Sequence, residues 1–341
     1  MKPGSVRRKN ISVSQSNLIK TELIQSKSLL PLVVQPAGER LNLITWAASN
    51  RDWIETHLLK HGGILFRNFK INGTTEFEQF IQTISGELLD YSYRSTPRSQ
   101  VSGKIYTSTE YPASQSIPLH NEMAYSLNWP MKIWFFCLES AEVGGETPIA
   151  DSRKVFARLD SKIKEKFIQK KVMYVRNYGD KLDLNWQNVF QTTNKSEVEN
   201  YCRKSGIEFE WKDSNHLRTR QVCQAVATHP KTGETVWFNQ AHLFHVSSLE
   251  QEVYQSLLAA FKEEDLPRNS YYGDGSPIEA FVLDEIRQVY QQEAVVFPWE
   301  EGDILMLDNM LAAHGRLPFA GSRKVLVGMA NPFTDKDIKC H

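Results

Sequence analysis

Short apolar runs separated by glycine-containing turns constrain the fold of this chain more than any other feature of its sequence. The runs are rich in β-branched and aromatic residues, and each has the length of one buried strand. They lie at residues 132–137 (KIWFFC), 172–175, 235–238 (TVWF), 294–297, 303–307 (DILML) and 324–329 (KVLVGM). Many short strands with turns between them predict a mainly β core of the sandwich or jelly-roll type.

Helical patterns flank this β core. Apolar residues recur with helical spacing in four segments. These segments are residues 46–59, 74–84, 155–170 and 249–263. Residues 1–30 begin with a Ser-, Lys- and Asn-rich stretch that has no periodicity, which predicts a loose N-terminal tail. We therefore expect one domain over residues 31–333, with a helical and loop insertion around 152–290 and a C-terminal tail at 334–341.

The charge balance argues against several classes of partner. Lys plus Arg and Asp plus Glu number 40 each, so the formal net charge is zero and there is no electrostatic footprint for nucleic acid or an anionic membrane. No apolar stretch reaches the roughly 18 residues of a membrane span, and no signal-peptide core is visible. The four cysteines have no CxxC spacing, so neither a disulfide framework nor a cysteine zinc site is expected. These features predict a cytoplasmic protein.

A His-x-Glu pair stands in the segment IPLHNE, where it is formed by His120 and Glu122. On an extended chain, residues i and i+2 point to the same face. The imidazole and the carboxylate therefore converge as two neighbouring ligands of one metal would. Such a pair also occurs by chance in many proteins, so it does not establish a metal site alone.

His314 supplies the third candidate ligand. It follows the apolar run ILML and precedes Gly315. A histidine after a strand is usually structural, but a jelly roll places its early and late strands side by side. Two imidazoles and one carboxylate on one face form the facial triad of non-haem iron oxygenases. The three remaining coordination positions accommodate a bidentate 2-oxo acid and dioxygen.

Arg323, nine residues after His314, indicates that an anionic co-substrate binds. A guanidinium at the mouth of an apolar barrel is costly unless it faces an anion. Its planar fork suits bidentate recognition of a carboxylate. Thr147, after a Gly-Gly-Glu turn, could donate its hydroxyl to the same carboxylate. The alternatives are a surface salt bridge for Arg323 and a plain turn or strand position for Thr147.

Four motifs in this order resemble a known family. They are IPLHNEMAYS, GGETPIADSR, VWFNQAHLFH and HGRLPFAGSRKVLVGM. Together they look like the TauD/TfdA type of iron(II)/2-oxoglutarate-dependent dioxygenases, most of all its branch of SyrP-like (syringomycin-biosynthesis) and clavaminate synthase-like enzymes. The resemblance covers roughly residues 30–333. It implies a double-stranded β-helix, iron(II) ligated by His120, Glu122 and His314, and 2-oxoglutarate bound through Arg323 and Thr147.

The resemblance also implies a reaction. An enzyme of this kind uses iron(II), 2-oxoglutarate and dioxygen to hydroxylate an unactivated C–H bond. The substrate would be a free amino acid or an amino-acyl group tethered as a carrier-protein thioester, in natural-product biosynthesis. Glu122 departs from the Asp of much of the wider family but matches the clavaminate synthase-like branch. It also argues against a halogenase, in which a small residue replaces the carboxylate.

Other outcomes remain open at this point. Desaturation or epoxidation would follow from the same chemistry. A zinc hydrolase also uses two histidines and a glutamate, and a jelly-roll protein can bind ligands without catalysis. Candidate substrate-binding residues are Tyr106, Ser108, Asn121, Arg218, Asn239, Gln240, His245 and Arg316. A second metal site at His242 and His245 is disfavoured, because no carboxylate accompanies them.

Overall fold

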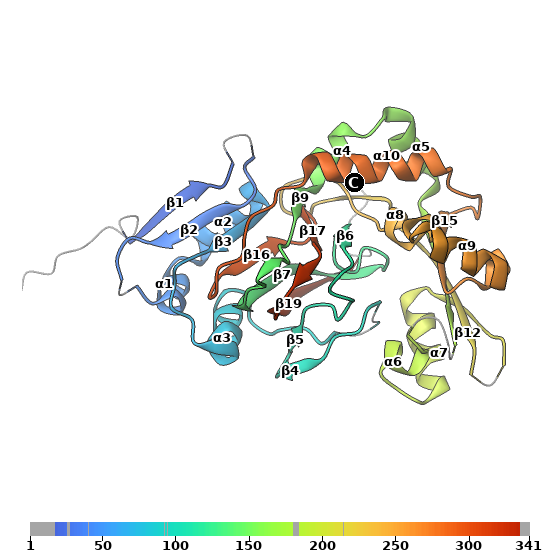
Figure 1. Ribbon diagram of the computed structural model, residues 1–341, viewed down its shortest axis with the longest axis horizontal. Helices are drawn as coiled ribbons and strands as arrows, with labels where there is room; N and C mark the ends of the chain where they lie inside the picture. Colours follow the sequence, from blue (N-terminus) through green and yellow to red (C-terminus); the bar gives the residue numbers. More distant parts are fainter. Residues whose placement is uncertain are drawn as a thin grey trace, which may run out of the picture.

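The computed structural model describes residues 18–334 apart from 26–27, 40, 92, 94, 180–183 and 214. A large sheet forms its centre (Figure 1). In spatial order its strands are β1 (Ile19–Leu23), β2 (Leu32–Pro36), β3 (Gly63–Phe66), β16 (Ile304–Asp308), β7 (Asn128–Glu139), β19 (Lys324–Thr334), β5 (Ile105–Thr107) and β4 (Gln100–Ser102). Strands from both ends of the chain thus lie side by side in one sheet.

A smaller sheet faces the large one. It contains β6 (Ile117–His120), β17 (Ala312–Arg316) and β9 (Ile149–Asp151), and the short pair β8 (Val143–Gly144) and β18 (Phe319–Ala320) continues along its edge. Residues from both sheets form one apolar core, in which Phe135 and Val327 of the large sheet join Ile149 and Ala312 of the small one. This double-stranded β-helix confirms the predicted jelly roll.

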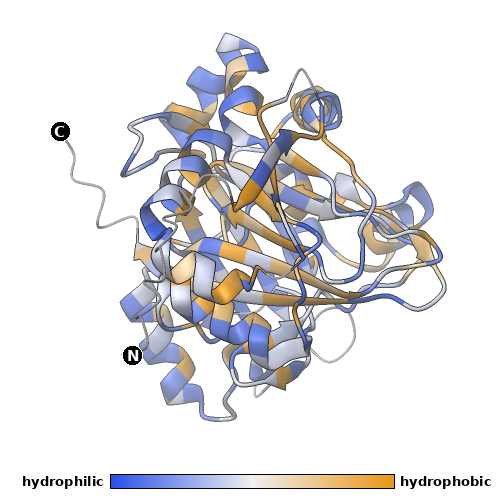
Figure 2. Ribbon diagram, turned by 90° about the vertical axis from the view of Figure 1, so that its left-hand side faces the viewer, coloured by the Kyte–Doolittle hydropathy of each residue, from blue (hydrophilic) through white to orange (hydrophobic). Residues whose placement is uncertain are grey.

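The run KIWFFC is apolar at consecutive positions because β7 is buried on both faces. Ile133 and Phe135 point into the core between the sheets. Trp134 and Phe136 point the other way, into a core shared with the N-terminal helices. Figure 2 shows the same division, with apolar colour along the central strands and many hydrophilic residues on the helices around them.

Three helices cover the outer face of the large sheet. They are α1 (Leu43–Ser49), α2 (Arg51–His61) and α3 (Gly73–Ser85). The single helix expected at 46–59 is two helices, because Asn50 leaves the helical region and its side-chain amide donates to the Trp46 carbonyl at 2.7 Å. The helix expected at 74–84 is confirmed as α3.

Residues 152–290 form a second body of structure beside the jelly roll, to the right of it and above it in Figure 1. Its sheet has the order β11 (Glu208–Trp211), β12 (Leu217–Cys223), β10 (Val172–Tyr178) and β15 (Arg268–Tyr272). A hairpin adds β13 (Val226–Thr228) and β14 (Thr235–Trp237). Its helices are α4 (Ser152–Arg158), α5 (Ser161–Lys170), α6 (Trp186–Phe190), α7 (Lys195–Ser205), α8 (Ala241–Phe244), α9 (Gln251–Ala260) and α10 (Ala280–Glu293). The description of this segment as an insertion within one domain stays a prediction.

Three expectations about secondary structure need correction. The helix expected at 155–170 is interrupted, because Asp160 caps α5 by accepting from the Lys162 amide at 2.8 Å. Residues 294–297 form no strand; Val295 makes only an isolated bridge with Ile149. Part of the expected N-terminal tail is the strand β1, which pairs with β2.

The rest of the expected tails, residues 1–17 and 335–341, lies outside the described residues. None of the helices in the described part of the chain is both long and apolar enough to cross a membrane.

Candidate metal centre

His120, Glu122 and His314 converge at one end of the small sheet. His314 lies opposite His120 in the antiparallel pair β6–β17, and their ring centroids are 4.5 Å apart. The Nε2 atom of His314 is 3.8 Å from the Oε2 atom of Glu122. One ligand atom from each residue lies within 4.8 Å of the other two. The sequence analysis singled out these three residues, and the fold brings them together.

A local irregularity between β6 and β17 allows this approach. The pairing register shifts between His314 and Arg316. A Cβ atom on Gly315 would lie 2.6 Å from the Ile117 carbonyl oxygen. Only glycine lets the two backbones come this close, which explains why a glycine follows the histidine.

Both histidines are in the state that a metal requires. His120 donates from Nδ1 to the Pro118 carbonyl at 2.8 Å, which leaves the Nε2 lone pair available. Burial lowers the pKa of His120, and it lowers the pKa of His314 well below the ordinary value. Neither ring nitrogen of His314 has a hydrogen-bond partner among the described residues, although only 3% of the residue is exposed. Such an unsatisfied buried imidazole fits a metal ligand.

The backbone of Glu122 is clamped to the turn that precedes β17. Asn309, fully buried, accepts from the Glu122 amide at 2.7 Å through Oδ1. Its Nδ2 atom donates to the carbonyls of Glu122 and Pro130, both at 2.9 Å. Asn309 thus fixes the ligand loop, a role that the sequence analysis missed. The only signal was its place just before the strand of His314.

Arg98 is the second residue that the sequence analysis missed. Its Nη2 atom donates to Oε2 of Glu122 at 2.7 Å, and its guanidinium lies 4.5 Å from the ring centroid of Tyr91. Burial alone lowers the pKa of Arg98, but Glu122 together with Tyr91 and Tyr125 outweighs this effect, so the pKa is raised. Nothing in the loop sequence around Arg98 indicates this contact.

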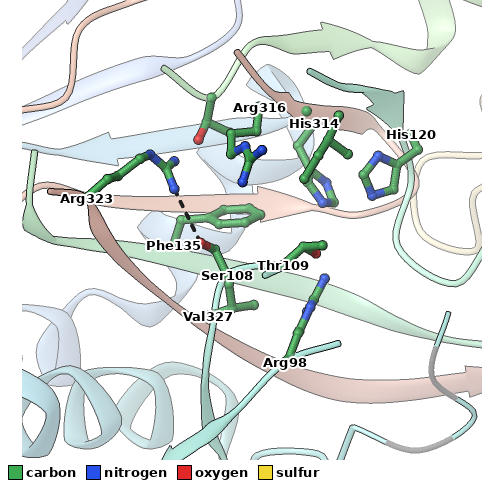
Figure 3. A pocket seen from close by; sticks show the side chains of 12 residues that line it. Arg98, Ser108, Thr109, His120, Phe135, His314, Arg316, Arg323 and Val327 are labelled. Carbon is green, nitrogen blue, oxygen red and sulfur yellow. Dashed lines mark hydrogen bonds between the residues drawn. The ribbon is translucent and has the colours of Figure 1, made fainter. Parts of the chain in front are cut away.

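The pocket beside the histidines continues towards Arg323 (Figure 3). Its lining residues are Arg98, Ser108, Thr109, Ile117, His120, Phe135, Thr147, His314, Gly315, Arg316, Arg323 and Val327. Arg323 donates from Nε to the Gly145 carbonyl at 2.8 Å and from Nη1 to the Ser108 hydroxyl at 3.3 Å. Burial lowers the pKa of Arg323 to about 10, which still leaves the group charged at neutral pH.

Thr147 and Ser108 line the same pocket as Arg323. Thr147 is buried, and its hydroxyl oxygen accepts from the indole nitrogen of Trp299 at 3.1 Å. Its own proton is left to donate to a ligand. Ser108 lines the pocket and accepts a hydrogen bond from Arg323, and its substrate-binding role stays a prediction.

Arg316 lines the pocket but uses most of its donors on the protein. Nη1 donates to the Tyr111 carbonyl at 2.9 Å, and Nη2 donates to the carbonyls of Pro112 and Gln115 at 2.7 and 2.8 Å. These bonds hold the loop between β5 and β6 against the small sheet.

Three predicted substrate-binding amides do not line the pocket. Asn121 donates to the Asn309 carbonyl at 2.7 Å and to the Ser152 hydroxyl at 3.0 Å. Gln240 donates to the Asn121 carbonyl at 2.7 Å. Asn239 donates to the Ala225 carbonyl, also at 2.7 Å. These buried amides satisfy backbone groups around the ligand loop, which their polarity alone did not reveal.

Three further candidates also lie away from the pocket lining. Arg218 pairs with Asp265 at 2.5 Å on the second sheet. The Nδ1 atom of His245 bonds the Ser247 hydroxyl at 2.8 Å. The hydroxyl of Tyr106 accepts from the Tyr91 amide at 3.2 Å. His242, whose Nε2 atom bonds the Leu119 carbonyl at 2.9 Å, belongs to no metal-binding cluster of described residues.

Comparison with known proteins gives a family match over most of the chain. The model of the taurine catabolism dioxygenase TauD, TfdA family matches residues 26–330. The dapdiamide synthesis protein DdaC of Enterobacter agglomerans is 44% identical over 279 residues, which are 82% of this chain and 85% of that protein. A clavaminate synthase-like protein of Arabidopsis thaliana is 29% identical over 297 residues, with 82% of this chain and 85% of that protein covered.

A solved structure shares the fold. The PvcB protein of Pseudomonas aeruginosa superposes with a TM-score of 0.56 at 14% identity, over 94% of both chains.

Proposed function

The chain belongs to the TauD, TfdA family of dioxygenases, and we propose that His120, Glu122 and His314 hold its iron(II). It is an iron(II)/2-oxoglutarate-dependent oxygenase, so the zinc hydrolase and the non-catalytic binding protein are set aside. The observation that carries the ligand assignment is the buried ring of His314. Neither of its nitrogens has a hydrogen-bond partner among the described residues, and its Nε2 atom lies 3.8 Å from Oε2 of Glu122.

We further propose that Arg323 and Thr147 bind the distal carboxylate of 2-oxoglutarate. Both line the pocket that contains the two histidines. A charged guanidinium in a half-buried site strengthens its attraction for a carboxylate, because little water screens the charges. The Thr147 proton adds a directed hydrogen bond. Together they fix the far end of the co-substrate, so its 2-oxo acid end is oriented towards the metal ligands.

The chain's residues orient the reactants, and the metal carries the chemistry. When bound, iron(II) couples the oxidative decarboxylation of 2-oxoglutarate by dioxygen to the oxidation of a substrate C–H bond. Three protein ligands would leave coordination positions for the co-substrates when a metal is bound. Arg316 holds the loop of residues 108–116 beside the pocket, which limits the access of water.

The proposed substrate is an amino acid or an amino-acyl group bound as a carrier-protein thioester, in natural-product biosynthesis. The relative named for dapdiamide synthesis supports a biosynthetic role. Hydroxylation is the proposed outcome, with desaturation or epoxidation as the alternatives at the same site. A cytoplasmic location belongs to the same proposal and agrees with the free thiols of Cys137, Cys202 and Cys223.

The metal assignment is tested under anaerobic conditions. Adding iron(II) and 2-oxoglutarate to the metal-free protein should produce a weak visible charge-transfer band, and His120→Ala should abolish it. His57→Ala is the matched control, because His57 lies on α2 and does not line the pocket. A band of equal strength in His120→Ala would contradict the ligand assignment.

The substrate proposal is tested in air. Free amino acids and their carrier-bound thioesters are compared for substrate-dependent release of succinate. Release with thioesters alone would establish a tethered substrate. No release with either group would contradict the proposed substrate class while leaving the metal assignment intact.

A further inference from the structure

Arg98 brings a buried positive charge to the edge of the proposed metal site. Its side chain points towards the two histidines from the side of the pocket opposite Arg323 (Figure 3). The 2.7 Å bond to Glu122 joins two side chains that are each only 3% exposed. A buried carboxylate is costly without a cation. Arg98 provides that cation.

A divalent metal bound by Glu122 would share this carboxylate with Arg98. Two opposing effects follow. The hydrogen bond holds the carboxylate in one orientation, which favours metal binding. The guanidinium repels the metal and also stabilises the metal-free carboxylate, which disfavours metal binding. In a buried site the charge effects exceed the gain from fixing one short side chain.

We propose that Arg98 is a positioning residue that weakens metal binding and strengthens binding of 2-oxoglutarate. The inference rests on the proposed ligand set. Because Glu122 divides its negative charge between two cations, the loaded site keeps more positive charge for the dianionic co-substrate. Removing the charge of Arg98 therefore changes the two affinities in opposite directions. Loss of a purely structural residue would weaken both.

The test uses Arg98→Gln, which removes the charge, and Arg98→Lys, which retains it. Binding of Mn(II) alone to the metal-free protein is measured from the electron paramagnetic resonance signal of free Mn(II). Binding of 2-oxoglutarate to the iron(II) protein is measured anaerobically from the visible band. We expect Arg98→Gln to bind Mn(II) about tenfold more tightly and 2-oxoglutarate about tenfold more weakly, with Arg98→Lys within about threefold of the wild type in both.

Arg67→Gln is the matched control. It breaks another arginine–carboxylate pair, the 2.6 Å contact with Asp303, and neither residue lines the pocket. This variant should lose stability but keep both affinities. Unchanged or weaker Mn(II) binding by Arg98→Gln would overturn the inference, and so would unchanged 2-oxoglutarate binding. If His120→Ala binds Mn(II) as the wild type does, the ligand assignment itself fails, which is a different result.

Discussion

The two ends of the pocket offer different groups to a ligand. At the histidine end, the buried nitrogens of His314 have no partner among the described residues, and the carboxylate of Glu122 is held nearby. At the other end, the described donor contacts of Arg323 are to a carbonyl and a hydroxyl, both neutral. The first end is built for a cation and the second for an anion. This difference supports the proposal that the pocket binds a metal and a dicarboxylate together.

Removing His314 should have the largest effect, which is loss of metal binding at the histidine end of the pocket. His314→Ala should lower the rate of succinate formation by more than about 10³-fold, because the metal contributes several kcal/mol to the reaction. Mn(II) binding should be lost in the same variant. His57→Ala, which changes a half-buried histidine outside the pocket lining, should keep both properties. Wild-type Mn(II) affinity in His314→Ala would remove His314 from the ligand set.

Changing Arg323 should weaken 2-oxoglutarate binding without changing metal binding. Arg323→Gln should weaken 2-oxoglutarate binding by about 30- to 100-fold, because a charge-assisted bidentate contact is lost. Arg323→Lys should fall between this variant and the wild type, since lysine keeps the charge without the planar fork. Anaerobic titration of the visible band gives the affinities. Mn(II) binding should not change, and an equal loss of Mn(II) binding would mean that the two ends do not act separately.

Removing the hydrogen bonds of Asn309 should lower the metal affinity without removing a metal ligand. Asn309→Ala deletes three hydrogen bonds that fix the Glu122 loop. We expect metal affinity to fall about tenfold and the free energy of unfolding to fall by about 2–4 kcal/mol. Asn42→Ala is the control, because it removes a helix cap at α1 instead. It should cost about 1 kcal/mol and leave Mn(II) binding unchanged. Unaltered metal affinity in Asn309→Ala would show that the loop holds its shape without the clamp.

The sequence pointed to the residues proposed at both ends because each stands in a motif with a recognisable pattern. His120 and Glu122 share one extended face, and Arg323 follows His314 at short range. The residues around them were not predictable in this way. Asn309 contacts Glu122 across a separation of 187 residues, and Arg98 reaches it from a loop without any pattern. Such contacts depend on how the jelly roll folds its loops together.

The same reasoning applies to the substrate-binding candidates that lie outside the pocket lining. Asn239 and Gln240 are polar residues before a helix, which is typical of both pocket residues and buried backbone-binding amides. The structure uses them for buried backbone carbonyls, because a loop packed against the core must satisfy these groups. The jelly roll itself was predictable, since short apolar runs of strand length recur along the chain.

The smallest expected effect is at Thr147, where a substitution tests the contribution of one hydroxyl to 2-oxoglutarate binding. Thr147→Val removes the hydroxyl but keeps the shape of the side chain, and Thr147→Ser keeps the hydroxyl. We expect Thr147→Val to weaken 2-oxoglutarate binding by about three- to tenfold, the value of one hydrogen bond to a charged group. Because valine also deprives the Trp299 indole of its acceptor, stability should fall slightly, and Thr147→Ser should restore both properties. If valine lowered stability but left 2-oxoglutarate affinity unchanged, the hydroxyl would serve Trp299 alone, and Arg323 would carry the recognition of the anion.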